Sequence, residues 1–150
     1  MQIVANNKKA FFEYFILEKI EAGIQLTGDE VKSLRVGKAS IKEAYAEAKK
    51  GQLFLVNSDI SNYEKASSYS KLNSKRVRKL LVHKKEISKL QGKIEKEGMT
   101  IIPLKLYFNN KGIAKVEIAI AKGKKLYDKR EVKKKKDWNI KKKRLLKNIN

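Results

Sequence analysis

Apolar and polar residues alternate along an early stretch of the chain. From Tyr14 to Leu26 every residue of even number is apolar, with Glu18 as the one interruption. A period of two is typical of a β-strand that has one buried face. The pattern therefore predicts a long strand here, and Gly23 is the position where we expect a bend or a bulge.

A helix is expected directly after this strand. Thr27 and Glu30 have the spacing of a capping box, in which each residue satisfies the backbone N–H of the other at a helix N-terminus. Val31 and Leu34 then fall on one helical face, and Gly37 can end the helix in the left-handed conformation. The sequence thus predicts a short helix between Thr27 and Gly37.

Two hairpins follow from alternating segments that flank polar turns. The last one has the clearest alternation, and its turn is rich in the asparagine and glycine that tight turns favour. The predicted strands and turns lie at 45–48 and 53–60 around 49–52, and at 102–108 and 114–120 around 109–112. Pro103 is expected near the start or the edge of its strand, because proline lacks the N–H that a central strand donates.

The middle of the chain is less regular. Ile87, Leu90 and Ile94 recur at helical spacing and predict an amphipathic helix that ends near Gly98. The apolar run at 78–82 is too short to assign to a helix or a strand. Residues 61–74 show no period and are rich in serine and asparagine, so they predict a mobile loop.

These elements favour a mainly β fold with peripheral helices. A small closed antiparallel barrel is the economical arrangement, because closure removes the exposed sheet edges. We expect residues 1–121 to form this barrel and Phe12, Phe15, Phe54 and Phe108 to enter its core.

Charge divides the chain into two parts. The formal net charge is +21, and residues 122–150 hold 14 Lys and Arg against 3 acidic residues. Runs of lysine repel one another, so we expect this tail to be disordered when free. Such an excess of positive charge indicates a polyanionic partner.

Several classes of protein are excluded by what the sequence lacks. The chain has no cysteine and one histidine, His83, which leaves no set of residues for a zinc site or a catalytic triad. Phosphate-binding loops, dinucleotide fingerprints and nucleophile elbows are absent. No apolar run reaches the length of a membrane helix. We therefore expect a cytoplasmic, non-enzymatic protein without metal or cofactor.

Basic residues around the 78–82 run and after the last strand predict a phosphate-binding margin. The alternative is that these lysines only keep the protein soluble. Tyr127 and Trp138 lie in polar, basic stretches and are candidates for stacking on unpaired bases. In the tail, Trp138, Leu145 and Ile149 share a narrow helical stripe, which suggests a helix that forms on binding.

Eight short stretches, taken together, resemble the SsrA-binding protein (SmpB) family. They follow one another in the order that the family shows. In this chain they are Asn7–Ala10, Glu13–Ile16, Glu21–Ile24, Gly28–Arg35, Gly37–Ala39, Arg78–Leu81, Pro103–Phe108 and Ala121–Arg130.

The resemblance implies a β-barrel of the oligonucleotide-binding (OB-fold) type and a role as a non-enzymatic adaptor of trans-translation. Members of this family bind the tRNA-like domain of transfer-messenger RNA (tmRNA, or SsrA RNA) and promote its alanylation. They accompany the charged RNA, with elongation factor Tu and GTP, to stalled ribosomes, where the incomplete peptide is tagged for degradation. The implied protein is a monomer with no membrane partner.

Residue roles follow from the same resemblance. The implied tmRNA-binding positions are Asn7, Glu21 and Leu81, with phosphate contacts from Lys8, Arg78, Lys79, Lys122, Lys124 and Lys125. The implied positions for the small-subunit decoding centre and the mRNA channel are Tyr127, Asp128, Lys129, Arg130, Trp138, Leu145 and Leu146.

The tail is expected to become helical in the empty mRNA channel. The alternative that composition alone supports is a generic basic ribosome- or nucleic-acid-binding protein without selectivity.

Overall fold

The computed structural model describes residues 1–63 and 73–124. Most of the predicted loop and all tail residues from 125 onward lie outside this part. Within the described residues there are three helices, α1 (Lys8–Glu13), α2 (Gly28–Arg35) and α3 (Lys84–Glu97). The strands are β1 (Gln2–Asn6), β2 (Tyr14–Ile24), β3 (Ala39–Ser40), β4 (Tyr45–Lys49), β5 (Gln52–Val56), β6 (Asp59–Ile60), β7 (Arg78–Leu81), β8 (Thr100–Phe108) and β9 (Ala114–Gly123).

Seven of the strands form one antiparallel sheet in the order β1-β8-β4-β5-β7-β2-β9. An additional pairing joins β9, the last strand of this order, to β8, the second, so that six strands follow one another in a ring and β1 attaches to β8 from outside the ring. The backbone pairing of β4 with β8 is limited to one residue pair, Ala46 with Ile101. The ring therefore joins weakly at this point and strongly along β2, β9 and β8.

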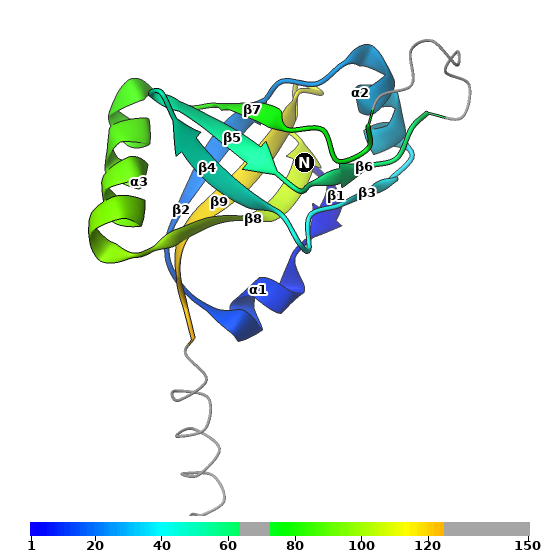
Figure 1. Cartoon of the computed structure of the whole chain (residues 1–150). Coiled ribbons are helices and arrows are strands. Elements are labelled where there is room, and N and C mark those ends of the chain that lie inside the picture. Colours follow the sequence, from blue (N-terminus) through cyan, green and yellow to red (C-terminus); the bar gives the residue numbers. More distant parts are fainter. Residues whose placement is uncertain (64–72, 125–150) are drawn as a thin grey trace, which may run out of the picture.

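The helices lie at three places around the strands (Figure 1). α3 lies beside the ends of β4 and β5, α2 lies near the small sheet of β3 and β6, and α1 lies near the start of β2. Within the described part of the chain, none of these helices is long and apolar enough to cross a membrane.

The first predicted hairpin is present but shorter than expected. Lys50 and Gly51 both have positive φ, 51° and 71°, as the two central residues of a tight turn require when it follows the twist of its strands. The single strand expected over 53–60 is wrong, because Asn57 also takes a positive φ of 65°. The chain leaves the large sheet there and pairs with β3 instead, as β6.

Both predicted helix termini have the expected chemistry. The Thr27 hydroxyl accepts from the Glu30 N–H at 3.2 Å, and a Glu30 carboxylate oxygen accepts from the Thr27 N–H at 2.9 Å, which completes the capping box of α2. Gly37, directly after the C-cap of α2, has the predicted left-handed conformation with φ of 75°. α3 ends at Gly98 as predicted, and this glycine also has a positive φ, 64°. The apolar run at 78–82, which the sequence did not assign to a helix or a strand, contains strand β7 (Arg78–Leu81).

The alternating strands serve two hydrophobic cores rather than one. Register shifts occur in β2 between Ile16 and Glu18, and in β8 between Pro103 and Lys105. A bulge turns the following residues to the opposite face. The pairing of β2 with β9 runs without a shift through Gly23, so the bulge predicted there is wrong. Pro103 lies beside the bulge of β8, where it pairs with β9 but with no strand on its other side, which is the predicted edge position.

Each bulge separates residues of one parity into two clusters. In β8, Leu106 and Phe108 face the interior of the ring, whereas Ile102 and Leu104 face a smaller core. α1 covers this smaller core with Ala10, which is 2% exposed.

Two aromatic residues predicted for the core are on the surface. Phe12 is 71% exposed and Phe15 is 46% exposed, while Phe108 is buried and Phe54 is half-buried. The short helix α1 buries only Ala10, which leaves the bulkier Phe11 and Phe12 outside. Strand β1 and helix α1 have no counterpart among the predicted elements.

Candidate nucleic-acid interface

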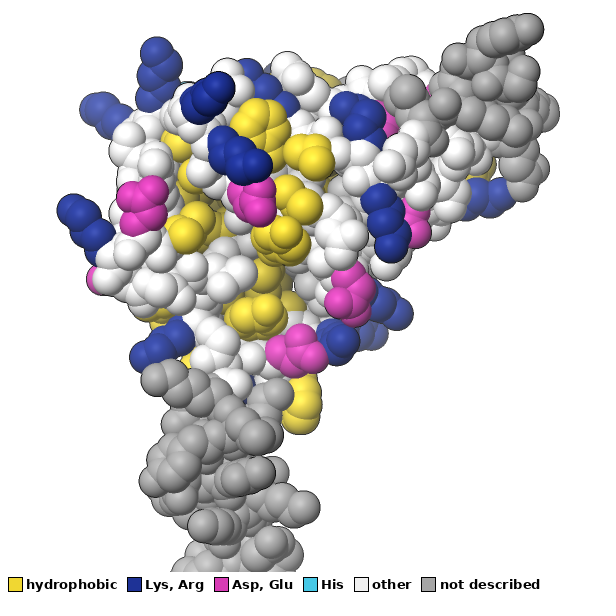
Figure 2. Space-filling view, viewed as in Figure 1, with side chains coloured by type: hydrophobic (Ala, Val, Ile, Leu, Met, Phe, Trp, Pro, Cys, Tyr) yellow, Lys and Arg dark blue, Asp and Glu magenta, His cyan; other side chains and the backbone are white. Residues whose placement is uncertain are grey.

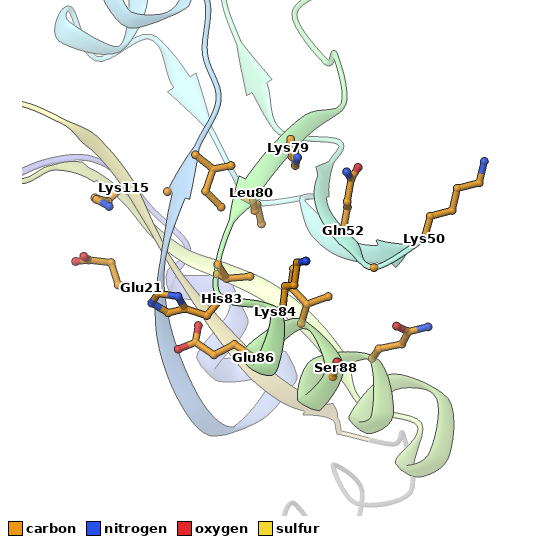
Figure 3. A pocket seen from close by; sticks show the side chains of 16 residues that line it. Glu21, Lys50, Gln52, Lys79, Leu80, His83, Lys84, Glu86, Ser88 and Lys115 are labelled. Atoms are coloured by element: carbon orange, nitrogen blue, oxygen red, sulfur yellow. The ribbon is translucent and has the colours of Figure 1, made fainter.

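A groove of about 1010 Å³ lies where β2, β7 and the start of α3 meet (Figure 3). Its lining includes three of the predicted RNA-binding residues, Glu21, Lys79 and Leu81. His83, at the N-cap of α3, and Lys115, on β9, lie along the same groove. We use the name Glu21 groove for this surface.

Strand register brings Glu21 and Leu81 together from distant parts of the sequence. Gly23 pairs with Leu81 across β2 and β7, two residues from Glu21 on the same face of β2. A Cβ atom at Gly23 would lie 3.2 Å from the Cβ of Leu81, closer than ordinary side-chain contact. Glycine therefore allows Leu81 to lie flat over β2, where it remains 47% exposed.

The charges that line the Glu21 groove are mainly positive. Lys79 on β7, Lys84 on α3, Lys115 on β9 and Lys50 in the turn between β4 and β5 line it, against Glu21 and Glu86. Lysines placed around an open groove attract a phosphate backbone. The exposed Leu81 side chain adds an apolar surface for a base.

The Glu21 carboxylate has a fixed neighbour. The Tyr107 hydroxyl, from β8, donates a hydrogen bond to Oε2 of Glu21. Burial raises the pKa of Tyr107, and the hydrogen bond to Glu21 and the charges of Glu21 and Glu117 raise it further, so the phenol keeps its proton at neutral pH. Sequence reasoning missed Tyr107, because only the strand register shows that it reaches Glu21.

Arg78 does not line the groove, and its predicted phosphate contact is wrong in this structure. Its side chain is 0% exposed and points inward from β7. Arg78 Nε donates to Glu30 Oε2 at 2.7 Å, and its other nitrogens donate to backbone and hydroxyl oxygens, including both oxygens of Ser58. Every side-chain nitrogen is thus used within the protein.

Glu30 joins two arginines to helix α2. Arg76 Nη2 lies 2.5 Å from Oε1 of Glu30, and Arg78 Nη2 lies 2.6 Å from Oε2. Burial alone would raise the pKa of Glu30, but hydrogen bonds from Arg76, the Thr27 backbone and Arg78 together lower it. The buried Glu30 carboxylate is therefore ionised and paired with both arginines, and these ion pairs hold β7 against α2.

Asn7 and Lys8 lie apart from the groove lining. Asn7 is 4% exposed, and its Nδ2 donates to the carbonyl oxygens of Pro103 at 3.0 Å and Ile41 at 3.5 Å. Its Oδ1 has no hydrogen-bond partner among the described residues, and Asn7 lines a separate cavity of about 290 Å³. Lys8 is exposed at the start of α1. Asn7 therefore fixes the segment before α1 rather than lining an open surface.

The end of β9 carries the two described lysines of the predicted basic margin. Lys122 is exposed, and Lys124 Nζ lies 5.1 Å from the centre of the Phe15 ring. The remaining predicted residues lie outside the described part of the chain: Lys125, Tyr127, Asp128, Lys129, Arg130, Trp138, Leu145 and Leu146.

A different surface appears on the face shown in Figure 2, where hydrophobic side chains gather in the middle and charged ones lie among and around them. A cavity of about 290 Å³ between β4 and α3 is lined by apolar side chains that include Ile94, Met99 and Ile101. It shares only Gln91 with the Glu21 groove.

Comparison with known proteins places these features in a family. The family model described as SmpB protein matches residues 4–148. The SsrA-binding protein of Nitrobacter winogradskyi is 56% identical over 146 residues, which cover 97% of this chain and 92% of that protein. The SsrA-binding protein of a Bradyrhizobium species is 55% identical over 144 residues, 96% of this chain and 91% of that protein.

The fold also matches a solved structure. A chain in the work described as "tmRNA-SmpB: a journey to the center of the bacterial ribosome" superposes with a TM-score of 0.67 at 49% identity. The match covers 81% of this chain and 84% of that one. Since a family model spans nearly the whole sequence and relatives exceed half identity over almost all of it, this chain belongs to the SmpB protein family.

Proposed function

We propose that this chain is a tmRNA-binding protein of trans-translation that acts on the ribosome without catalysing a reaction. The observation that carries the proposal is membership of the SmpB family over residues 4–148. The relatives named SsrA-binding protein and the solved tmRNA-SmpB structure support tmRNA and the ribosome as its partners. The lysine-lined groove is a surface of the kind that such binding needs.

In this proposal the tRNA-like domain of tmRNA binds the Glu21 groove. Lys79, Lys84 and Lys115 contact phosphates, while Leu81 packs against a base. Glu21 accepts hydrogen bonds only, so it faces the N–H groups of a base edge rather than a phosphate. The ring of six strands serves as a barrel of the oligonucleotide-binding type that holds these residues rigidly.

The basic residues outside the groove extend the RNA contact. Lys8 at the start of α1 and Lys122 at the end of β9 are exposed and can neutralise phosphates on neighbouring turns of the RNA. Asn7 supports this region by fixing the segment before α1 to β8 and to Ile41. Such contacts add affinity without reading the sequence.

We further propose that residues 127–150 act on the ribosome rather than in RNA capture. Tyr127, Asp128, Lys129 and Arg130 would act at the decoding centre. Trp138, Leu145 and Leu146 would form the anchoring stripe of a helix in the empty mRNA channel. Recognition of a stalled ribosome whose mRNA channel is empty would then depend on this segment.

Competition binding to the isolated tRNA-like domain of tmRNA tests the proposed capture step. We expect the full chain to bind at near-physiological salt in the presence of excess tRNA and duplex DNA. Lys79→Ala and Leu81→Ala should each weaken binding about 5- to 20-fold. Lys111→Ala and Ile113→Ala, in the exposed turn between β8 and β9, are the matched controls and should leave it unchanged.

Equal competition by tRNA or DNA would contradict the proposal and return the protein to the generic basic class. A second measurement addresses the tail. Deleting residues 128–150 should leave affinity for the tRNA-like domain intact and abolish peptide tagging on stalled ribosomes. Loss of both activities in a folded truncation would contradict the division of roles.

A further inference from the structure

Tyr107 lies on the outer face of the sheet, in a row that leads to the Glu21 groove. In β8 it pairs with Lys115 of β9, and Lys115 pairs in turn with Gly23 of β2. The phenol therefore reaches across β9, about 10 Å from its own strand to β2, to contact Glu21. Tyr107 is 6% exposed, so its ring is fixed by packing while its hydroxyl touches an exposed carboxylate.

The hydrogen bond has a defined direction. The raised pKa of Tyr107 keeps its proton in place, so the phenol donates and Glu21 accepts through Oε2. Within the described part of the chain, no hydrogen bond is formed to the other oxygen, Oε1. That oxygen remains an acceptor on a residue that lines the groove.

Glu21 would not keep this orientation by itself. It pairs directly with Glu117 across β2 and β9, and two like charges in that position repel each other. Lys19 Nζ lies 4.0 Å from Glu117 Oε1 and offsets part of that charge, but it does not contact Glu21. The Tyr107 hydroxyl is thus the contact that holds the Glu21 carboxylate in one rotamer.

We propose that Tyr107 is a positioning residue for RNA recognition, which fixes Oε2 of Glu21 so that Oε1 accepts an N–H of an unpaired base. The chemical class of the ligand group is an exocyclic amino or ring imino N–H, since these are the donors on exposed base edges. Lysines on the same groove take the phosphates, which a carboxylate would repel. The inference rests on the proposed function, because it concerns the same groove.

A double-mutant cycle tests whether Tyr107 acts through Glu21. Dissociation constants for the tRNA-like domain of tmRNA are measured for the wild type, Tyr107→Phe, Glu21→Ala and the double variant. Tyr107→Phe removes only the hydroxyl, and we expect it to weaken binding about tenfold. In the Glu21→Ala background the same change should alter binding less than twofold, because its target is gone.

Two controls separate positioning from general damage. Tyr45→Phe removes the hydroxyl of an exposed tyrosine on β4, outside the groove, and should leave the affinity unchanged. The slope of log affinity against log salt should be the same for Tyr107→Phe and wild type, because no phosphate contact is lost. A tyrosine that only stabilised the fold would weaken binding equally in both backgrounds.

The outcomes of these binding measurements distinguish failure of the Tyr107 proposal from failure of the proposed function. An equal loss in both backgrounds, an unchanged affinity of Tyr107→Phe, or an unchanged affinity of Glu21→Ala would overturn the role assigned to Tyr107. In all three cases selective binding by the wild type would leave the proposed function standing. Failure of the wild type to prefer tmRNA over competitor tRNA would instead refute the proposed function.

Discussion

Replacing Glu30 by glutamine tests how the buried ion pair holds α2 to β7. Glu30 is 6% exposed, and its carboxylate contacts Arg76, Arg78 and the backbone N–H of Thr27. Glutamine keeps the size of the side chain but removes its charge. The Arg78 guanidinium, 0% exposed, would then lose its counter-charge while it remains buried.

The burial of Arg78 sets the size of the expected loss in the free energy of unfolding. Removing one partner of a buried ion pair costs about 3–5 kcal/mol, because the other charge remains without compensation. Arg78 donates hydrogen bonds to Ser58, Ser74 and Arg76 as well as to Glu30, and those to carbonyl and hydroxyl oxygens remain in the variant. We therefore expect a loss near the lower limit, about 3 kcal/mol of the free energy of unfolding.

Urea unfolding at pH 7 measures this change, with Glu97→Gln as the control. Glu97 Oε2 lies 2.8 Å from Lys93 Nζ, but both side chains are substantially exposed, so the control should lose at most about 0.5 kcal/mol. High salt should leave the Glu30→Gln deficit in place, because a buried pair is screened little. A deficit below about 1 kcal/mol would refute the claim that this ion pair holds α2 to β7.

The stability difference between wild type and Glu30→Gln should also depend on pH. The pKa of Glu30 is lowered in the folded protein from its ordinary 4.5, so the native state favours the ionised form. Its contribution is complete above the unfolded pKa and is lost as the pH falls through the folded value. The difference between wild type and Glu30→Gln should therefore shrink below pH 4.5. A difference that grows in acid would contradict the pairing.

Three further substitutions probe other parts of the structure. Gly23→Ala should displace Leu81, whose Cβ would lie 3.2 Å from the new atom, and weaken RNA binding several-fold with little change in thermal midpoint. Gly98→Ala forces a non-glycine residue to φ of 64° and should lower the free energy of unfolding by about 1 kcal/mol in urea. Leu90→Ala leaves a cavity at a 0% exposed position and should cost about 2–5 kcal/mol in the same assay.

Local chemistry could be predicted from the sequence because it depends on neighbours in the chain. The capping box of Thr27 and Glu30 formed as expected, Gly37 takes the predicted left-handed conformation, and α3 ends next to Gly98 as predicted. The alternation of the last hairpin likewise predicted β8 and β9. Each of these depends on residues within a few positions of one another, so no knowledge of the tertiary fold was needed.

Contacts between distant residues were not predictable in the same way. Arg78 was expected to contact phosphate, from its basic cluster and the family resemblance, yet it meets Glu30 across 48 positions of sequence. The bulges in β2 and β8 divide a single alternating pattern between two cores, and periodicity alone carries no sign of that division. Glu21 and Leu81 were paired through family resemblance, whereas Tyr107 became visible only with the strand register.

The single residue pair between β4 and β8 makes this junction a seam of the sheet. Backbone hydrogen bonds hold β2, β9 and β8 along most of their lengths, but at the seam α3 packs across the two sides with Ile87 and Leu90 in the core. Side-chain packing thus does there what hydrogen bonds do elsewhere. Local opening should begin at the seam, and amide protons of β4 should exchange with solvent sooner than those of β9.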